Sequence, residues 1–389
     1  MKKTFIILTI LFLVVNTYGQ KELSELIKTN QLTFKYQQDQ FKGAGWDKII
    51  SEIASHKNTL IGEDHFFNEI PLFISEVIST IDIDNFFCEI DPYSGELISE
   101  NLRKLPQNEL NTFIADYSYA FSFYALKPEF NLLKTLVKKG TNIIGTDQIA
   151  LTSDGLIANK LKHITQNAKA RKIYSEIEVK AKQQYGLFTS QKGSPYMFTD
   201  AFEQNLEALQ KLQLSKDEEE ILSKLKLSKE IYRTQNHHLR IQLMKNTVIK
   251  NIASVQNERN LFKYGAIHMN KAESSLGGYD IGNLVSTISD ANFDASLHIA
   301  ILGKSGIQGV PFKGMQPQKI DVSRKGLKHY SSFFEASDAT HWSVFDINSI
   351  RKAVKSNKIR IDNKMLLNIL NGFDYVIVIP NVTPSEFMD

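Results

Sequence analysis

The amino-acid sequence predicts an α/β fold: a mostly parallel sheet flanked by helices, with an all-helical insertion. Short apolar runs typical of buried strands alternate with segments of helical periodicity. Several of these runs end in carboxylate or histidine side chains, and open α/β sheets bind their ligands at the carboxyl ends of the strands. Between about 151 and 235 the strand signals stop, and long, charged, helix-prone sequence replaces them.

The chain begins with a segment that predicts export. Lys2 and Lys3 form a positively charged start, an apolar run follows over 5–15, and the segment ends at the small residue Gly19. The apolar run is too short for a comfortable membrane span, although a retained anchor is the alternative. We therefore expect residues 1–19 to be a cleaved signal peptide, leaving a periplasmic or secreted protein with no stable membrane span.

Composition narrows the function further. Of the 46 Lys and Arg residues, two lie in the predicted signal peptide, which leaves 44 against 43 Asp and Glu. This balance carries no electrostatic footprint for nucleic acid, so the expected partner is a small-molecule substrate or ligand. The single cysteine, Cys88, lies in an apolar run and is interpreted as a small core residue.

The first half of the chain predicts three strands separated by helices. Residues 21–58 have apolar positions at helical spacing and predict a helical lead-in. Strands are expected at 59–62, 85–90 and 142–145. Between them, the spacing predicts a helix from about Asn68, and further helices at 94–103, 108–120 and 129–138.

The second half predicts the insertion and a return to the sheet. Ser215 and Glu218 form a capping-box pattern before a long helix within 151–235. Further strands are expected at 261–266, 296–302 and 375–379, with a possible edge strand at 342–345. The α/β core domain would then comprise 20–150 and 236–389, with 151–235 as the helical insertion.

Polar side chains follow four of the predicted strands. If the sheet is parallel, they project from a single edge, and this convergence is the main functional signal in the sequence. Taken one at a time, His268 is more simply interpreted as a core histidine, and Asp147 is interpreted equally well as the cap of a turn. The strand-end residues are Glu63, Asp64, His65, Glu89, Asp91, Asp147 and His268.

Two kinds of chemistry suit these residues. A carboxylate that orients a histidine can activate water by general acid–base catalysis. Alternatively, His65 and His268 with Glu63 or Glu89 could bind a divalent metal ion that lowers the pKa of a bound water. No Gly-x-Ser-x-Gly, P-loop, His-Glu-x-x-His or Gly-x-Gly-x-x-Gly motif is present, which disfavours those enzyme classes.

Four motifs follow one another along the chain: Gly62-x-x-His65, the strand ending at Glu89, Arg240-x-x-x-Met244 and Tyr264-Gly265-Ala266-x-His268. Their order resembles the erythromycin esterase-like, ChaN-like and TraB/Tiki superfamily. The resemblance covers about 55–290 and the closing strand. Two departures are that Ile241 replaces the acidic residue expected after the arginine, and that Lys245 replaces a small residue.

This resemblance implies a parallel α/β core whose strand-end Glu and His residues form the site. Its esterase branch implies hydrolysis by activated water, its ChaN-like branch haem binding, and its TraB/Tiki branch metal-dependent proteolysis. The resemblance therefore leaves three alternatives for the cofactor: no cofactor, a divalent metal ion or haem. The site residues that it implies are Glu63, His65, Glu89, Arg240 and His268, with Arg240 either stabilising an oxyanion or balancing the carboxylates.

Overall fold

The structure is a computed structural model that describes residues 22–324, 326–356 and 358–388. The predicted signal peptide, residues 1–19, lies outside these ranges. Within them, every helix is too short or too polar to cross a lipid bilayer. The chain forms two compact units. Unit 1 comprises the described residues through Asp64, Gly265–Ile307 and Lys319–Val382, and unit 2 comprises His65–Tyr264, Gln308–Gln318 and the described residues from Thr383.

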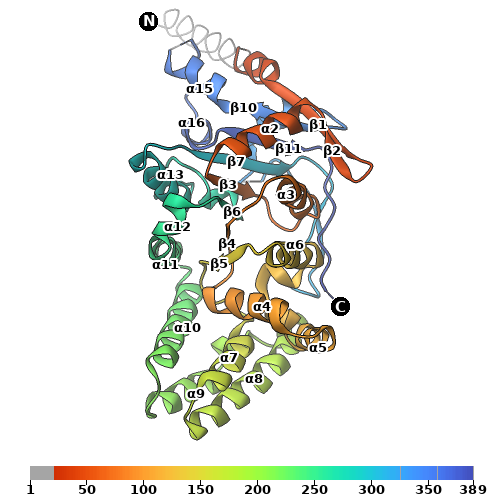
Figure 1. Cartoon of the computed structure of the whole chain (residues 1–389). Helices are drawn as coiled ribbons and strands as arrows, with labels where there is room; N and C mark the ends of the chain where they lie inside the picture. The colour runs from red at the N-terminus through yellow and green to blue at the C-terminus, as the bar shows by residue number, and fades with distance from the viewer. Residues whose placement is uncertain (1–21, 325, 357, 389) are drawn as a thin grey trace, which may run out of the picture. The chain divides into compact units, whose positions relative to one another are not determined.

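Unit 1 contains a twisted sheet with parallel and antiparallel parts (Figure 1). The strands β11, β7 and β3 are parallel neighbours, whereas β2, β1 and β10 continue the sheet in antiparallel order. The parallel strands are buried along their whole length, as expected for strands covered on both faces. The strands are β1 (Gln31–Gln37), β2 (Gln40–Lys42), β3 (Asn58–Glu63), β7 (Ser296–Gly303), β10 (Trp342–Asp346) and β11 (Tyr375–Ile379).

The helices of unit 1 connect these strands. Those with strongly amphipathic sequences bury one face and expose the other, as α15 does through Ile347 and Ile350. The helices are α2 (Ala44–Ser55), α13 (Ile281–Ala291), α14 (Ser331–Ala336), α15 (Ile347–Lys355) and α16 (Lys364–Gly372), with the 3₁₀ turns η4 (Ala266–His268) and η5 (Lys328–Tyr330). Figure 1 labels α2, α13, α15 and α16.

Unit 2 carries three parallel strands in the order β6, β4, β5. They are β4 (Asn85–Cys88), β5 (Asn142–Gly145) and β6 (Asn260–Gly265, whose last residue belongs to unit 1). Their connecting helices are α3 (Glu69–Thr80), α4 (Pro92–Lys104), α5 (Gln107–Tyr117) and α6 (Lys127–Lys138). The 3₁₀ turns η1 (Ser118–Ala120) and η2 (Ser122–Ala125) precede α6. Together the two units confirm the predicted α/β class with mostly parallel central strands.

Between β5 and β6 the described chain is entirely helical. A capping box at Ser215 and Glu218 starts the long helix α10, as the sequence predicts. A buried cluster that includes Tyr174, Met197 and Phe202 holds these helices together. The boundaries of the insertion stay a prediction. The helices are α7 (Asp154–Ile164), α8 (Ala168–Thr189), η3 (Tyr196–Phe198), α9 (Asp200–Gln210), α10 (Lys216–Thr234), α11 (His237–Lys250) and α12 (Ile252–Asn257).

The structure differs from the sequence expectation over residues 31–42. This stretch forms the hairpin β1–β2 instead of continuing the helical lead-in. Gln38 and Asp39 have φ angles of 51° and 56°, which suit a tight two-residue hairpin turn. The hairpin forms because Phe34 and Phe41 pack on Trp342 of β10. Consequently β10 is an internal strand, not the edge strand that the sequence indicated. The short strands β8 (Ile307–Gln308) and β9 (Gln318–Lys319) were not predicted.

Three asparagines fix the register at the start of the strands of unit 2. Asn85 of β4 lies opposite Asn142 of β5 and Asn260 of β6. Its Nδ2 donates to Oδ1 of Asn260 at 3.0 Å, and its Oδ1 accepts from Nδ2 of Asn142 at 3.1 Å. Because a slip by one residue would separate all three amides, this ladder specifies the parallel pairing.

We expect Asn85→Ala to lower the free energy of unfolding by about 1 to 3 kcal/mol, because buried partner amides lose their hydrogen bonds. Urea unfolding measures this. Asn257→Ala, at an exposed asparagine at the end of α12, is the matched control and should stay within about 0.5 kcal/mol. Equal effects of the two substitutions would contradict the role of the ladder.

Candidate functional site

In unit 2, Arg240 joins the ends of two strands. Its Nε and Nη2 atoms donate to the two carboxylate oxygens of Asp147 at 2.8 and 2.6 Å, which is a bidentate pair. Nη2 also donates to Oε1 of Glu89 at 2.5 Å. Burial by itself lowers the pKa of Arg240, but Asp147 and Glu89 more than offset it and hold that pKa well above its usual value. Arg240 is therefore a permanent cation that balances two buried carboxylates.

His65 faces the second oxygen of Glu89. Nε2 of His65 lies 3.6 Å from Oε2 of Glu89, while Oε1 of Glu89 is held by Arg240. The imidazole ring stacks on Phe123, with ring centroids 4.6 Å apart. The side chain of His65 is 24% exposed, so one face can reach solvent or a ligand. A histidine next to an anchored carboxylate is suited to accept a proton, because the carboxylate stabilises the imidazolium.

The loop that carries His65 is clamped from two distant segments of unit 2. Nε2 of Gln308 donates to the carbonyl oxygen of His65 at 2.9 Å. The carbonyl oxygen of Phe66 accepts from the backbone N–H groups of Gly309 and Ser385 at 3.1 and 3.0 Å. Phe66 has a φ of 73°, a left-handed conformation that costs free energy for a residue with a side chain. Such strain persists only where surrounding contacts hold it, and here it redirects the chain directly after His65.

Glu89 and Asp147 owe their positions to the parallel pairing of β4 and β5. Cys88 and Gly145 are paired at the ends of these strands, so both carboxylates emerge at the same edge. Gly145 lies so close to the neighbouring loop that an added Cβ atom would stand 2.6 Å from the carbonyl oxygen of Asp91. Only glycine permits this approach. Cys88 is fully buried, and burial raises the pKa of its thiol to about 12, which fits the core role that the sequence predicted.

Asp91 has a structural position in unit 2. Its Oδ1 accepts from the backbone N–H of Ser94 at 2.9 Å and so caps the start of α4. Burial raises the pKa of Asp91 to about 6, although its hydrogen bonds with Ser94 act in the opposite direction. Its contacts are those of a helix cap.

The remaining sequence candidates lie in unit 1. Glu63 ends β3 and is buried, and Asp64 forms an ion pair with Arg324. His268 ends the turn η4, and its Nδ1 lies 2.8 Å from Oδ2 of Asp280, which also caps α13. This contact fixes the orientation of the imidazole ring.

Unit 1 brings the end of β3 and the turn η4 together through Gly62. A Cβ atom on Gly62 would stand 2.8 Å from Cα of Ala266, so only glycine allows the close approach. The strand end that carries Glu63 and the turn that carries His268 are therefore neighbours within this unit. Their shared placement agrees with the sequence expectation that both belong to strand ends.

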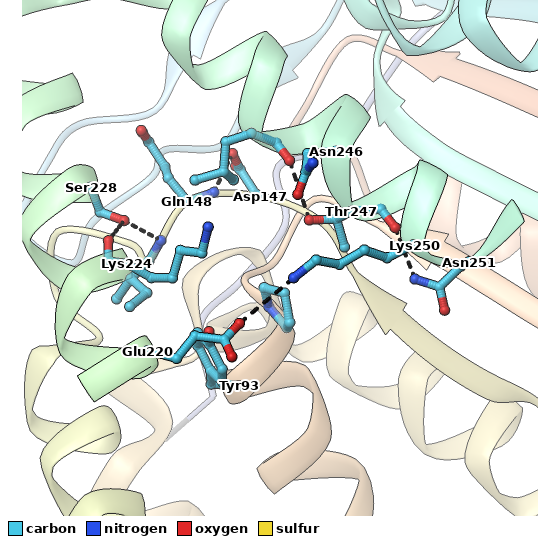
Figure 2. A pocket seen from close by; sticks show the side chains of 13 residues that line it. Tyr93, Asp147, Gln148, Glu220, Lys224, Ser228, Asn246, Thr247, Lys250 and Asn251 are labelled. Atoms are coloured by element: carbon cyan, nitrogen blue, oxygen red, sulfur yellow. Dashed lines mark hydrogen bonds and ion pairs between the residues drawn. The ribbon is translucent and has the colours of Figure 1, made fainter. Parts of the chain in front are cut away.

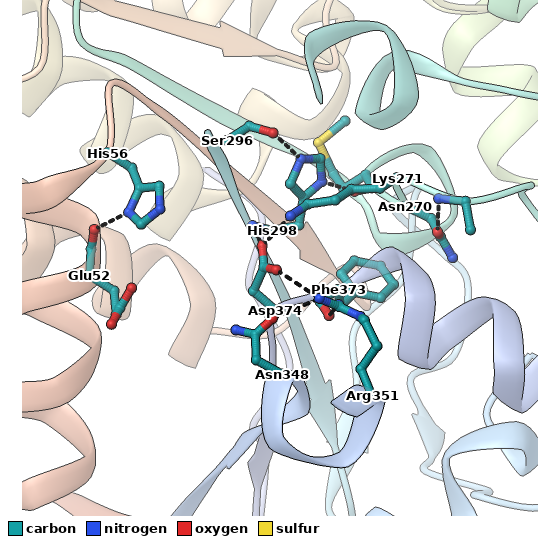
Figure 3. Close-up of polar contacts among 12 residues, drawn as sticks. Glu52, His56, Asn270, Lys271, Ser296, His298, Asn348, Arg351, Phe373 and Asp374 are labelled. Carbon is teal, nitrogen blue, oxygen red and sulfur yellow. Dashed lines mark hydrogen bonds and ion pairs between the residues drawn. The ribbon is translucent and has the colours of Figure 1, made fainter. Parts of the chain in front are cut away.

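A second histidine of unit 1 is a buried structural residue (Figure 3). Nδ1 of His298 contacts the carbonyl oxygen of Met269 at 2.6 Å, and Nε2 contacts Oγ of Ser296 at 2.7 Å. Burial lowers the pKa of His298 to about 3, so the ring is neutral near pH 7. Asp374 accepts from the backbone N–H of His298 and from Lys271, which ties β7 to β11.

A cavity of about 420 Å³ in unit 2 opens beside the carboxylate–arginine cluster. Arg240 and Asp147 form part of its wall, and Phe123, which stacks on His65, forms another part. The other lining residues are mostly apolar: Phe66, Leu126, Ala150, Leu151, Ile231, Tyr232, Pro311 and Phe312, with Ser122, Gln148, Thr152, Gln235 and His237 as polar neighbours.

The sequence did not single out three of these pocket residues. Phe123 lies in an aromatic stretch that is typical of a core, and its contact with His65 was not predictable. Gln148 follows Asp147 directly, and this position next to a strand-end carboxylate was the one sequence signal that could have indicated it. Tyr232 lies in the helical insertion; burial together with Asp147 raises the pKa of its phenol, which stays protonated.

The described residues contain no group of three or more His, Cys, Asp and Glu side chains arranged to hold a metal ion. His65, Glu89, Asp147 and Arg240 instead form a network of direct ion pairs and hydrogen bonds. This arrangement suits acid–base chemistry by the side chains themselves.

No protein-family model and no curated protein matches the sequence. Solved structures do match over nearly the whole chain. An erythromycin esterase mutant, EreC, in its open conformation has a TM-score of 0.59 at 12% identity, covering 92% of this chain and 99% of that one. A succinoglycan biosynthesis protein has a TM-score of 0.55 at 17% identity, covering 95% and 99%. A Bacillus cereus protein has a TM-score of 0.54 at 10% identity, covering 95% and 99%.

These likenesses show that the chain has an erythromycin esterase-like fold. At such low identities they show the fold alone, so the function has to be argued from the side chains of this protein.

Proposed function

We propose that the protein is an exported hydrolase that activates water with histidine and glutamate side chains at strand ends and cleaves an ester or amide. The observation that carries the proposal is the position of His65. Its Nε2 faces one oxygen of Glu89, whose other oxygen is anchored by Arg240. An accessible imidazole beside a fixed carboxylate can act as a general base, because the carboxylate orients the ring.

In the proposed reaction, His65 takes a proton from a water molecule, and the water oxygen attacks the substrate carbonyl carbon. The carboxylate of Glu89 stabilises the imidazolium that forms. His65 then returns the proton to the leaving oxygen or nitrogen as the carbon–heteroatom bond breaks. Arg240 holds Glu89 in place through a hydrogen bond. Because Arg240 is already hydrogen-bonded to Asp147 and Glu89, its proposed role is to balance these carboxylates and not to bind an oxyanion.

Glu63 and His268, which lie in unit 1, are kept as candidate catalytic residues on the strength of their motifs alone. The buried contact between His268 and Asp280 would orient the ring for a second proton transfer. A divalent metal is not needed for this route, and the lack of a suitable ligand group among the described residues favours the metal-free form. Export through residues 1–19 remains part of the proposal.

We expect His65→Ala and Glu89→Gln each to lower kcat/KM by about 10²- to 10⁴-fold, the usual contribution of a general base and its partner. The assay uses residues 20–389 with a panel of aryl esters and peptide amides, with and without a chelator. Activity should survive chelation. Circular dichroism checks that both variants remain folded.

Two exposed residues of the same types provide controls. His163→Ala on α7 and Glu96→Gln on α4 should leave kcat/KM unchanged. Full activity in both His65→Ala and Glu89→Gln would refute the assignment. Loss of activity on chelation, restored by one divalent ion, would instead favour the metal-dependent route.

The alternative function is binding of haem or another small ligand, as in the ChaN-like branch that the motifs resemble. It would use the same strand-end residues without a reaction. A haem titration separates the two functions: a Soret band shift that disappears in His65→Ala, with no turnover of any ester or amide, would favour the binding protein.

A further inference from the structure

We propose that the 420 Å³ cavity of unit 2 binds a compact, neutral aromatic ester that bears a hydroxyl or N–H group. Gln148 accepts a hydrogen bond from this group. The inference deepens the proposed function and rests on it, because it names the substrate class for the cavity next to His65, whose stacking partner Phe123 lines the wall. Three features support this inference: a hydrogen-bond acceptor of Gln148 without a donor, the aromatic side chains that line the cavity, and the net charge of the neighbouring ion pairs.

Gln148 presents a buried acceptor without a partner. The residue is only 6% exposed, and its Oε1 atom has no hydrogen-bond partner among the described residues. A buried carbonyl that lacks a donor costs about 1 to 3 kcal/mol, and such groups in native proteins call for an explanation. Gln148 lines this cavity and a neighbouring one, and a ligand donor that reaches Oε1 from the cavity would supply the missing hydrogen bond.

Hydrogen bonds hold the backbone around Gln148, and Figure 2 shows this segment in the wall of the neighbouring pocket, which Gln148 also lines. Its N–H donates to Oδ1 of Asp147 at 2.7 Å, and the N–H of Ile149 donates to Oγ of Ser228 at 2.9 Å. Asp147 is itself fixed by the bidentate pair with Arg240. An acceptor on such a fixed segment is preorganised, so little entropy is lost when a donor binds.

The rest of the lining favours a compact aromatic group. Phe66, Phe123, Tyr232 and Phe312 contribute aromatic side chains, which stack well on another ring. The volume of about 420 Å³ lies toward the small end of the usual range for ligand pockets. It has room for one or two rings.

The charges beside the cavity favour a neutral substrate. Arg240 is the cation of the wall, and it already balances Asp147 and Glu89. One cation between two carboxylates leaves a net charge of −1, which repels an anionic substrate in a partly desolvated site. A carboxylate-bearing ester is therefore expected to bind poorly.

The test uses matched probes and residues 20–389. The substrates are methyl 2-, 3- and 4-hydroxyphenylacetate and their methyl-substituted counterparts, which have similar size but no donor. Their ketone analogues, in which CH₂ replaces the ester oxygen, cannot be hydrolysed and report binding alone by calorimetry. We expect at least one hydroxyl isomer to exceed its methyl counterpart by about tenfold or more, both in kcat/KM and in affinity of the ketone.

Gln148→Met should reduce this ratio to about one, because methionine fills similar space without the acceptor. Gln235→Met changes an exposed glutamine at the same cavity and should keep the ratio. Gln148→Leu provides a second variant, and thermal unfolding checks that both remain folded. Equal ketone affinities in the wild type, or the same preference after Gln148→Met, would overturn the inference.

The two kinds of probe separate this inference from the proposed function. Discrimination among the ketones without hydrolysis of any ester would remove the hydrolase and keep the donor-reading pocket. Hydrolysis of the esters without discrimination would keep the hydrolase and remove the role of Gln148.

Discussion

Arg240→Met is expected to lower the free energy of unfolding by about 3 to 5 kcal/mol, the usual cost of leaving buried charges without their partner. The carboxylates of Glu89 and Asp147 are 6% and 10% exposed, and both are hydrogen-bonded to Arg240. Without it, two neighbouring carboxylates would remain in a partly desolvated site. Urea unfolding monitored by circular dichroism measures the loss.

Two further variants test the physical reason. Arg240→Lys should recover only part of the stability, since one ammonium group cannot reproduce the bidentate pair with Asp147 together with the bond to Glu89. Adding Glu89→Gln and Asp147→Asn to Arg240→Met should restore stability, because the unbalanced charges disappear. Arg233→Met is the control: its pair with Glu230 is exposed, so the change should be at most about 1 kcal/mol. A similarly small effect of Arg240→Met would contradict the role of the cluster.

Asp154→Asn is expected to stabilise the protein at neutral and higher pH. Asp154 starts α7, and burial raises the pKa of its carboxyl group from about 3.8 to about 7. Its Oδ2 atom has no hydrogen-bond partner among the described residues, and backbone hydrogen bonds to the carboxyl group offset the effect of burial only in part. The difference in pKa corresponds to roughly 4 kcal/mol at most.

The sign follows from proton binding. Between about pH 4 and pH 7 the unfolded Asp154 has lost its proton while the folded one retains it, so the free energy of unfolding falls as the pH rises. Above pH 7 both forms are ionised and the full cost is present. The wild type and Asp154→Asn should therefore have similar stability near pH 4 and diverge by several kcal/mol by pH 8.

Guanidinium unfolding of both proteins from pH 4 to pH 8 measures this divergence. Asp200→Asn, at an exposed aspartate that starts α9, is the matched control and should run parallel to the wild type at every pH. A constant difference between the wild type and Asp154→Asn across the range would contradict a buried, titrating carboxyl group.

Local sequence patterns were sufficient for much of the fold. The strands at 142–145 and 375–379 begin and end as predicted, because apolar runs bounded by polar or turn residues are a strong local signal. The capping box at Ser215 and Glu218 is likewise local, since both partners lie within one helical turn. The burial of Cys88 followed from its apolar neighbours.

Other features depend on residues far apart in the sequence. The hairpin at 31–42 exists because Phe34 and Phe41 pack on Trp342, about 300 residues away in the sequence. The spacing of apolar residues within 21–58 cannot predict this contact. The same strand pairing makes β10 internal.

For the candidate site, the sequence by itself determined which side chains stand at strand ends, because strand position and residue type are local properties. Only the tertiary structure decided their partners: Arg240 bridges Asp147 and Glu89, and His65 lies between Glu89 and Phe123. It also decided that Asp91 caps a helix and that Gln148 has a buried acceptor without a donor. Hydrogen bonding and burial arise from residues that meet only in the folded chain, and sequence spacing does not specify them.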